Sequence, residues 1–215
     1  MSPAFRSVIL DVDSTLAQLE GVDWLAAQRG PEVGSAVEQL TRRAMEGIVP
    51  LERVYAERLG LIRPTKAEID LLAKVYVDAL APGAAGCVAR LRASGVRVVL
   101  VSGGLRDALL HLAHVLGVQP TDVHAVRVTY DASDAVEGLD GVQPLTTALG
   151  KRDVVQALSL PEPVLAVGDG MTDAAIRPVV AAFAAFTAFE RRTAVVASAD
   201  HEVVSFAALE RLVFP

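Results

Sequence analysis

Three short apolar runs, each followed directly by acidic or small residues, constrain the fold of this chain most strongly. They cover residues 7–10, 96–101 and 164–167, and their β-branched composition predicts buried strands. Helical patterns lie between and after them, as in residues 105–116, where leucine recurs at helical spacing. This alternation predicts the α/β class, with a Rossmann-like parallel sheet covered by helices on both faces.

A long segment separates the first two predicted strands, whereas a simple crossover needs only about a dozen residues. Within it, residues 22–79 are charged and helix-patterned, and three prolines mark expected helix starts: Pro31, Pro50 and Pro64. We therefore expect a small helical cap, inserted over residues 19–81, and a returning core helix near residues 84–93.

The rest of the chain, residues 1–18 and 82–215, is assigned to the α/β core. Hydrophobic residues make up 52% of the chain but aromatic residues only 5%. The core must therefore consist mostly of Ala, Val and Leu. Residues 123–146 mix valine with aspartate and glycine, a pattern that predicts a strand followed by a turn-rich loop.

Charge and cysteine content limit the partners and the compartment. The net charge of −6 argues against binding to nucleic acid and to anionic membrane surfaces. The single cysteine, Cys87, excludes an intrachain disulfide and a thiolate metal cage. Charged residues interrupt the first apolar stretch, and the longest apolar run, residues 178–189, is shorter than the roughly 20 residues that span a bilayer. We expect a soluble, cytoplasmic protein.

Residues able to do chemistry follow all three predicted strands. Residues 11–15 follow the first strand, residues 102–104 the second and residues 168–173 the third. The carboxyl ends of parallel strands share one edge of the sheet, and this edge is where open α/β sheets bind ligands. We therefore expect these three segments to converge on one site.

Three carboxylates at this edge predict a metal site. Asp11 and Asp13 are two residues apart, so on extended backbone their side chains start on the same face, and Asp169 should approach from a nearby strand. Such carboxylates repel one another unless a cation compensates. Oxygen ligands favour Mg²⁺, which also suits a phosphate substrate because it neutralises the phosphate oxygens.

Two further elements fit a phosphate group. Ser102, Gly103 and Gly104 lead into the helix expected near Leu105, which brings a hydroxyl, backbone without a Cβ and helix N-terminal amides together. A strand-to-helix turn that needs glycine is the alternative interpretation. Lys151, at the start of a helical pattern, offers a compact charge for a transferring phosphoryl group, or is a surface lysine.

Four elements of this chain are, in chain order, similar to the four signature motifs of the haloacid dehalogenase superfamily of phosphatases. They are residues 11–15, residues 102–104, Lys151 and residues 168–173. The similarity runs over residues 7–175. Within the superfamily, segments of the expected cap resemble the phosphoserine phosphatase family: residues 20–23, 41–47, 49–51 and 57–59.

The resemblance implies a phosphatase that uses a covalent mechanism. Asp11 attacks phosphorus and carries the phosphoryl group as an aspartyl phosphate. Asp13 protonates the leaving oxygen of serine and then accepts a proton from the hydrolytic water. Ser102, Gly103 and Lys151 hold the phosphoryl oxygens.

The resemblance also implies the ligands of Mg²⁺. They are the Asp11 side chain, the backbone carbonyl of Asp13 and Asp169. Asp173 supports these ligands or orients Lys151.

The substrate implied by the resemblance is L-phosphoserine, a small phosphomonoester. Glu20 matches the family position that binds the ammonium group, and Arg58 matches the position that binds the carboxylate. Taken without the resemblance, both are ordinary solvated charges. Met45 and Leu51 line the pocket by the same resemblance, although apolar packing within the cap explains them equally well.

The chain departs from the family pattern at three places. Leu51 stands where the family usually has Phe, Thr172 replaces an Asn found in many relatives, and residues 185–189 lack the glycines that are common after the fourth motif. No site role is assigned to Arg191 or Arg192.

Other functions remain as alternatives. The same aspartyl phosphate can be hydrolysed for another small phosphomonoester, or passed to an acceptor alcohol such as homoserine. A signalling receiver also carries an aspartyl phosphate, an acidic Mg²⁺ site and a lysine, but it lacks a helical insert. Dehalogenase activity is disfavoured, because displacement at carbon needs no second acid two residues after the nucleophile.

Overall fold

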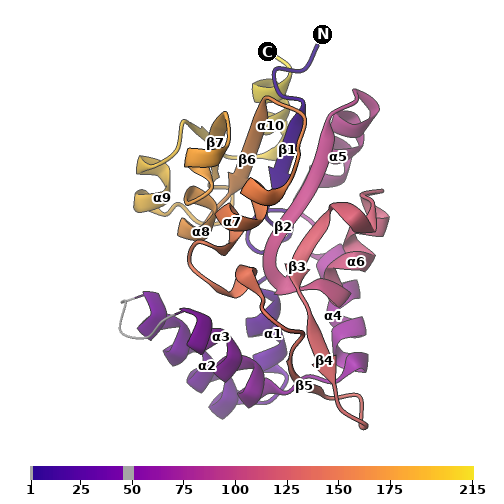
Figure 1. Ribbon diagram of the computed structural model, residues 1–215, viewed down its shortest axis with the longest axis vertical. Coiled ribbons are helices and arrows are strands. Elements are labelled where there is room, and N and C mark those ends of the chain that lie inside the picture. The colour runs from indigo at the N-terminus through magenta and orange to yellow at the C-terminus, as the bar shows by residue number, and fades with distance from the viewer. Residues whose placement is uncertain (1, 46–50) are drawn as a thin grey trace.

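The central element is a parallel sheet with the strand order β3-β2-β1-β6-β7-β8 (Figure 1). The structure is a computed structural model that describes the backbone of residues 2–45 and 51–215 and the side chains of residues 2–40 and 53–215. The strands of this sheet are β1 Ser7–Leu10, β2 Arg97–Leu105, β3 Val123–Val126, β6 Val164–Gly168, β7 Ala182–Phe186 and β8 His201–Val203.

The three strands expected from the apolar runs are confirmed as β1, β2 and β6. They lie side by side, with Leu10 of β1 in register with Leu100 of β2 and with Val167 of β6. Every residue of β1 and β6 is buried. Since successive side chains point to opposite faces, both faces of the sheet are covered, as expected for this fold class.

Helices pack against this sheet and extend from its edge. The described helices are α1 Gly21–Ala27, α2 Pro31–Met45, α3 Leu51–Ile62, α4 Lys66–Asp78, α5 Ala84–Ala93, α6 Arg106–Val115, α7 Gly150–Ala157, α8 Met171–Ala174, α9 Thr193–Ala197 and α10 Phe206–Val213. The returning core helix expected near residues 84–93 is α5, which packs against β2 and α10. Among the described residues, no helix is long and apolar enough to cross a membrane.

The segment between β1 and α5 contains α1, α2, α3 and α4. Figure 1 shows α1, α2 and α3 beyond one edge of the sheet, whereas α4 runs beside α6, against which it packs. The α4 helix begins with a capping box, in which the Thr65 hydroxyl accepts from the Glu68 N–H and the Glu68 carboxylate accepts from the Thr65 N–H. The helix starts expected at Pro31 and Pro64 agree with α2 and α4, while Pro50 lies outside the described residues.

The expected strand and turn-rich loop over residues 123–146 contain more regular structure than the pattern indicated. After β3, strands β4 Val128–Tyr130 and β5 Val136–Leu139 form an antiparallel pair outside the main sheet. An isolated bridge joins Thr65 to Ala135 and links this pair to the start of α4. The pair therefore extends from the core toward the inserted helices.

Candidate active site

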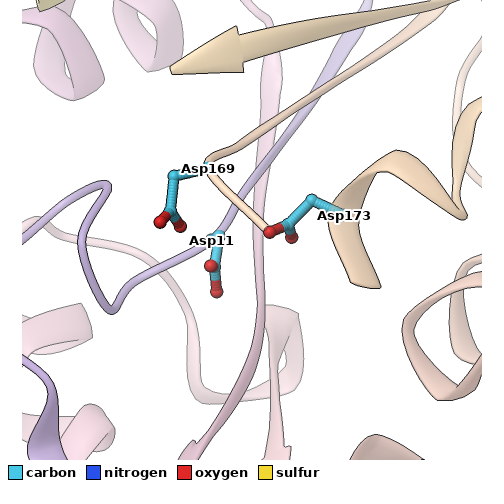
Figure 2. Close-up of side chains that lie close together, drawn as sticks. All are labelled: Asp11, Asp169 and Asp173. Atoms are coloured by element: carbon cyan, nitrogen blue, oxygen red, sulfur yellow. The ribbon is translucent and has the colours of Figure 1, made fainter. Parts of the chain in front are cut away.

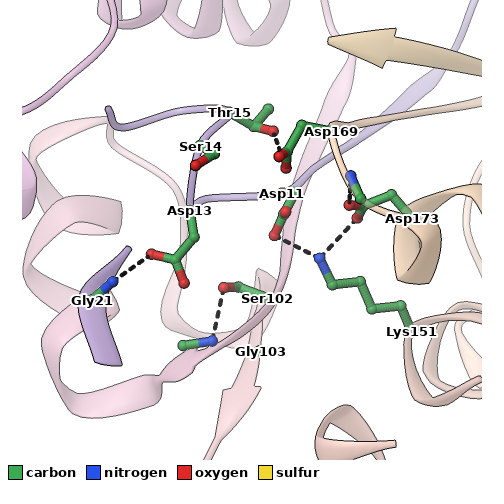
Figure 3. Close-up of polar contacts among 12 residues, drawn as sticks. Asp11, Asp13, Ser14, Thr15, Gly21, Ser102, Gly103, Lys151, Asp169 and Asp173 are labelled. Atoms are coloured by element: carbon green, nitrogen blue, oxygen red, sulfur yellow. Dashed lines mark hydrogen bonds and ion pairs between the residues drawn. The ribbon is translucent and has the colours of Figure 1, made fainter. Parts of the chain in front are cut away.

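The three segments expected to carry the chemistry, residues 11–15, 102–104 and 168–173, converge at one edge of the sheet. Asp11 follows β1 directly, Ser102 lies within β2, and Asp169 follows β6. Figure 3 shows their side chains grouped together, and all three are buried. The parallel register of the strands brings together residues that are far apart in the sequence.

Lys151 joins the first and third of these segments through two ion pairs. Its Nζ lies 2.7 Å from Oδ1 of Asp11 and 2.8 Å from Oδ1 of Asp173 (Figure 3). Although burial opposes it, the two carboxylates raise the pKa of Lys151 above its usual value. Lys151 is the second residue of α7. A Cβ on the first residue, Gly150, would lie 1.7 Å from the Pro144 carbonyl oxygen, so glycine is required there.

The carboxylates of Asp11, Asp169 and Asp173 form a group that can hold a metal ion. Their nearest oxygens lie within 4.8 Å of one another, and Figure 2 shows the three side chains converging. All three are buried and offer only oxygen, which hard divalent cations prefer. Asp173 is already engaged, since Oδ1 accepts from Lys151 and Oδ2 accepts from the Gly170 N–H at 3.1 Å. Asp11 and Asp169 are engaged as well, by Lys151 and Arg192, so the fit to a hard cation rests on the oxygen chemistry and the convergence of the three carboxylates.

Burial and mutual repulsion perturb these carboxyl groups. Burial raises the pKa of Asp11 well above its usual range, and the charge of Asp173 raises it further, while Lys151 opposes both. Burial, followed by the charge of Asp173, raises the pKa of Asp169 to about 6. A bound cation would favour the charged carboxylates and reduce this repulsion.

Asp13 lies in a different environment. Its Oδ1 accepts hydrogen bonds from the Gly21 N–H at 3.2 Å and from the Tyr76 hydroxyl at 2.6 Å. Burial, followed by the charge of Glu20, raises the pKa of Asp13 to about 7. A carboxyl group with such a pKa can both donate and accept a proton near neutral pH.

The expected phosphate-binding segment, Ser102 to Gly104, lies within β2 and not in a loop after it. The Ser102 hydroxyl accepts from the Gly104 N–H at 3.0 Å, and α6 begins two residues later at Arg106. From α3, the Tyr55 hydroxyl donates to the Gly103 carbonyl oxygen at 2.8 Å. A Cβ on Gly104 would approach Ser102 Oγ to 3.2 Å, so a larger residue would crowd the segment.

Of the four substrate-binding residues expected in the insert, the structure describes the side chains of two, Glu20 and Arg58. Glu20 is exposed and accepts from the Ser14 hydroxyl at 2.6 Å. Arg58 pairs with Asp23 through one terminal nitrogen, and its buried Nε has no hydrogen-bond partner among the described residues. The part of the chain that the structure describes shows no ion pair between Glu20 and Arg58. The side chains of Met45 and Leu51 lie outside the described residues.

Sequence reasoning missed three residues that contact the site. No site role was expected for Arg192, yet its guanidinium pairs with the Asp169 carboxylate. An arginine distant in sequence carries no mark of such a contact. Tyr55 and Tyr76 lie in helical patterns where a tyrosine is usually part of the apolar packing, and only the structure shows where their hydroxyls point.

Comparison with known proteins identifies the family. A model of the haloacid dehalogenase-like hydrolases matches residues 5–176. The phosphoserine phosphatase of Bos taurus is 35% identical over 94% of this chain and 91% of its own length. The chloroplastic phosphoserine phosphatase of Arabidopsis thaliana is 34% identical over 95% of this chain and 70% of its own length. The chain therefore belongs to the haloacid dehalogenase-like hydrolases and is an enzyme.

Solved structures agree on the fold. A phosphoserine phosphohydrolase-like protein from Francisella tularensis has a TM-score of 0.85 and 24% identity, with 96% of this chain and 99% of that chain covered. A phosphoserine phosphatase in a phospho-aspartyl intermediate analogue form has a TM-score of 0.73 and 24% identity, with 93% of each chain covered.

Proposed function

We propose that this enzyme hydrolyses L-phosphoserine to L-serine and phosphate through an aspartyl phosphate, with Mg²⁺ as its cofactor. The observation that carries the proposal is the buried arrangement of Asp11, Lys151 and Asp173 beside a second acid, Asp13, whose pKa is about 7. The relatives named phosphoserine phosphatase support the choice of substrate.

In the first step, an oxygen of Asp11 attacks phosphorus while the bond from phosphorus to the serine oxygen breaks. Lys151 holds Oδ1 of Asp11, and its charge would stabilise the negative charge that develops on the phosphoryl oxygens. Asp13 donates its proton to the leaving serine oxygen, so a neutral alcohol departs.

In the second step, a water molecule attacks the phosphorus of the aspartyl phosphate. Asp13, now a carboxylate, accepts a proton from this water. The bond between phosphorus and the Asp11 oxygen breaks, which regenerates the Asp11 carboxylate and releases inorganic phosphate. The Ser102 hydroxyl and the Gly103 amide bind phosphoryl oxygens in both steps.

We propose that the cation is held by Asp11, by the Asp13 backbone carbonyl and by Asp169, with Asp173 orienting Lys151. When bound, Mg²⁺ supplies positive charge that offsets the repulsion between the phosphate and the carboxylates.

Substrate recognition is assigned to Glu20 and Arg58 of the insert, which we propose acts as a cap over residues 19–81. Arg58 pairs with Asp23 in this structure, and the carboxylate of phosphoserine would take the place of Asp23. Glu20 would bind the ammonium group. Met45 and Leu51 are proposed to line the same pocket. Such an enzyme would act in serine synthesis, and we propose that it does so in the cytoplasm.

The test is phosphate release from a panel of phosphomonoesters in the presence of Mg²⁺. L-phosphoserine should be preferred over phosphothreonine, phosphoethanolamine and sugar phosphates. Arg58→Ala should lower kcat/KM for L-phosphoserine and spare p-nitrophenyl phosphate. Arg53→Ala is the matched control, since Arg53 lies on the same helix in an exposed pair with Glu57. Equal losses on both esters in Arg58→Ala would refute carboxylate recognition by Arg58.

A further inference from the structure

Tyr76 reaches the candidate active site from α4, the helix that packs against α6. Its side chain is fully buried, and its hydroxyl donates to Oδ1 of Asp13 at 2.6 Å. A buried hydroxyl that meets a carboxylate at this distance makes a strong, directional contact. Nothing in the reaction as described above uses Tyr76.

The surroundings of Asp13 direct its two oxygens differently. Oδ1 accepts from both Tyr76 and the Gly21 N–H. A Cβ on Gly21 would lie 2.0 Å from the Tyr76 hydroxyl oxygen, so the absence of a side chain there admits this hydroxyl to Oδ1.

The other oxygen of Asp13 faces the phosphate-binding segment. A Cβ on Gly104 would lie 3.4 Å from Oδ2 of Asp13 and 3.2 Å from both Ser102 Oγ and the Tyr76 hydroxyl oxygen, so Oδ2 and this hydroxyl both lie beside that segment. Figure 3 shows one carboxylate oxygen of Asp13 bound to Gly21 and the other directed toward the side where Ser102 lies. Since Oδ1 already accepts from two donors, a proton on Asp13 belongs on Oδ2.

We propose that Tyr76 is a positioning residue for Asp13, which fixes the carboxyl group so that Oδ2 carries the proton toward the leaving oxygen of the substrate. This inference rests on the proposed function, because it assumes that Asp13 is the acid. Tyr76 itself touches neither the substrate nor the phosphoryl group in this scheme.

The consequence depends on the leaving group. As the bond between Asp11 and phosphorus forms, the bond from phosphorus to the ester oxygen breaks, and the Oδ2 proton moves to that oxygen. An alkoxide such as that of serine needs this proton, whereas p-nitrophenolate leaves as a stable anion. Loss of Tyr76 should therefore slow phosphoryl transfer from L-phosphoserine selectively.

The experiment measures kcat/KM of Tyr76→Phe for L-phosphoserine and for p-nitrophenyl phosphate. Because kcat/KM covers the steps up to departure of the alcohol, it reports on the protonation of the leaving group. The ratio of the two values should fall about tenfold or more relative to the wild type, a part of the 10²- to 10⁴-fold that a general acid typically contributes.

Tyr130→Phe is the matched control. The Tyr130 hydroxyl donates to an Asp107 carboxylate oxygen at the same distance of 2.6 Å, but on the surface and away from the proposed reacting groups. This variant should leave the ratio of the two values unchanged, so a drop confined to Tyr76→Phe is not the general cost of losing a tyrosine hydroxyl.

Two further variants guard against a merely structural effect. Gly21→Ala keeps the N–H donor but displaces the Tyr76 hydroxyl, so it should reproduce the selective loss even if Tyr76→Phe folds poorly. In an Asp13→Asn background, which has no acid proton, Tyr76→Phe should no longer change the ratio of the two kcat/KM values.

The outcomes separate this inference from the proposed function. If the wild type hydrolyses both esters and Tyr76→Phe and Gly21→Ala lower both values by the same factor, or by none, the role of Tyr76 is refuted while the phosphatase assignment stands. If the folded wild type releases phosphate from neither ester, the proposed function fails, and the role of Tyr76 fails with it.

Discussion

Replacing Lys151 by methionine tests how the buried charges of the site are balanced. The ammonium group lies 2.7 Å from Asp11 and 2.8 Å from Asp173, and each attraction is about 6 kcal/mol at an effective dielectric constant of ~20. Methionine removes both attractions but also removes the cost of burying the ammonium group. Breaking a buried ion pair by deleting one partner costs about 3–5 kcal/mol net, and we expect a loss of that size in the free energy of unfolding.

The assay is urea unfolding at pH 7 in the presence of a chelator, so that no cation substitutes for the lysine. Asp173→Asn and the double variant with Lys151→Met complete a double-mutant cycle. Without Lys151, the carboxylate of Asp173 repels that of Asp11, so the double variant should be more stable than the sum of the single losses indicates, by about 2 kcal/mol.

The control is the same kind of substitution, a long cationic side chain replaced by methionine, at an exposed position. Arg53→Met removes an exposed cation from a surface pair and should change stability by only about 0.5 kcal/mol. A loss in Lys151→Met as small as that of Arg53→Met, or strict additivity in the cycle, would refute the view that Lys151 compensates these carboxylates.

Three other predictions follow from local contacts. Hydrogen bonds from Arg29 lower the pKa of Glu68 to about 2, so the charged Glu68 stabilises the fold above about pH 4.5, and this contribution is lost as pH falls toward 2. Because both side chains are partly exposed to solvent, Glu68→Gln should lower the free energy of unfolding in urea at pH 7 by only about 1 kcal/mol. The difference between wild type and variant should vanish at low pH. Calorimetry should show that Asp169→Asn weakens Mg²⁺ binding and that Mg²⁺ raises the Tm of the wild type more than that of the variant; an equal rise would count against Asp169 as a ligand. Gly150→Ala should destabilise the protein by about 1–3 kcal/mol and lower kcat, because its Cβ would collide with the Pro144 carbonyl; unchanged Tm and kcat would contradict this.

The strands β1 and β6 were predictable because two signals coincide in the sequence, namely an apolar run and the acidic residue after it. Residues 7–10 and 164–167 are mostly apolar and rich in β-branched residues; Asp11 follows the first run directly, and Gly168 and Asp169 follow the second. The parallel α/β arrangement predicts that the ends of these strands share one edge, and the structure adds that β1 pairs with both β2 and β6.

Other parts of the fold could not be predicted, for physical reasons. Strand β7, Ala182–Phe186, was not expected because alanine has a low strand propensity, yet all five residues are buried between β6 and β8. Its state is decided by the space available between its neighbours. The same holds for α4, whose position beside α6 depends on packing that no local pattern records.

In the site, motif residues were predictable and the residues that orient them were not. Spacing placed Asp11, Asp13 and Asp169 at one edge. The contacts of Tyr76 and Arg192 depend on the direction of a long side chain from a distant element, which residue type alone does not specify. The Arg58 contact with Asp23 is likewise a property of the folded insert.

The register of the three central strands also bears on how this protein acquires its activity during folding. Leu10 pairs with Leu100 and with Val167, so the groups around Asp11 come from parts of the chain that meet only after long loops have closed. No fragment that lacks one of these strands can assemble the constellation. Recovery of catalysis on refolding should therefore lag behind helix formation and report the last long-range pairing, which makes turnover a sensitive measure of complete folding.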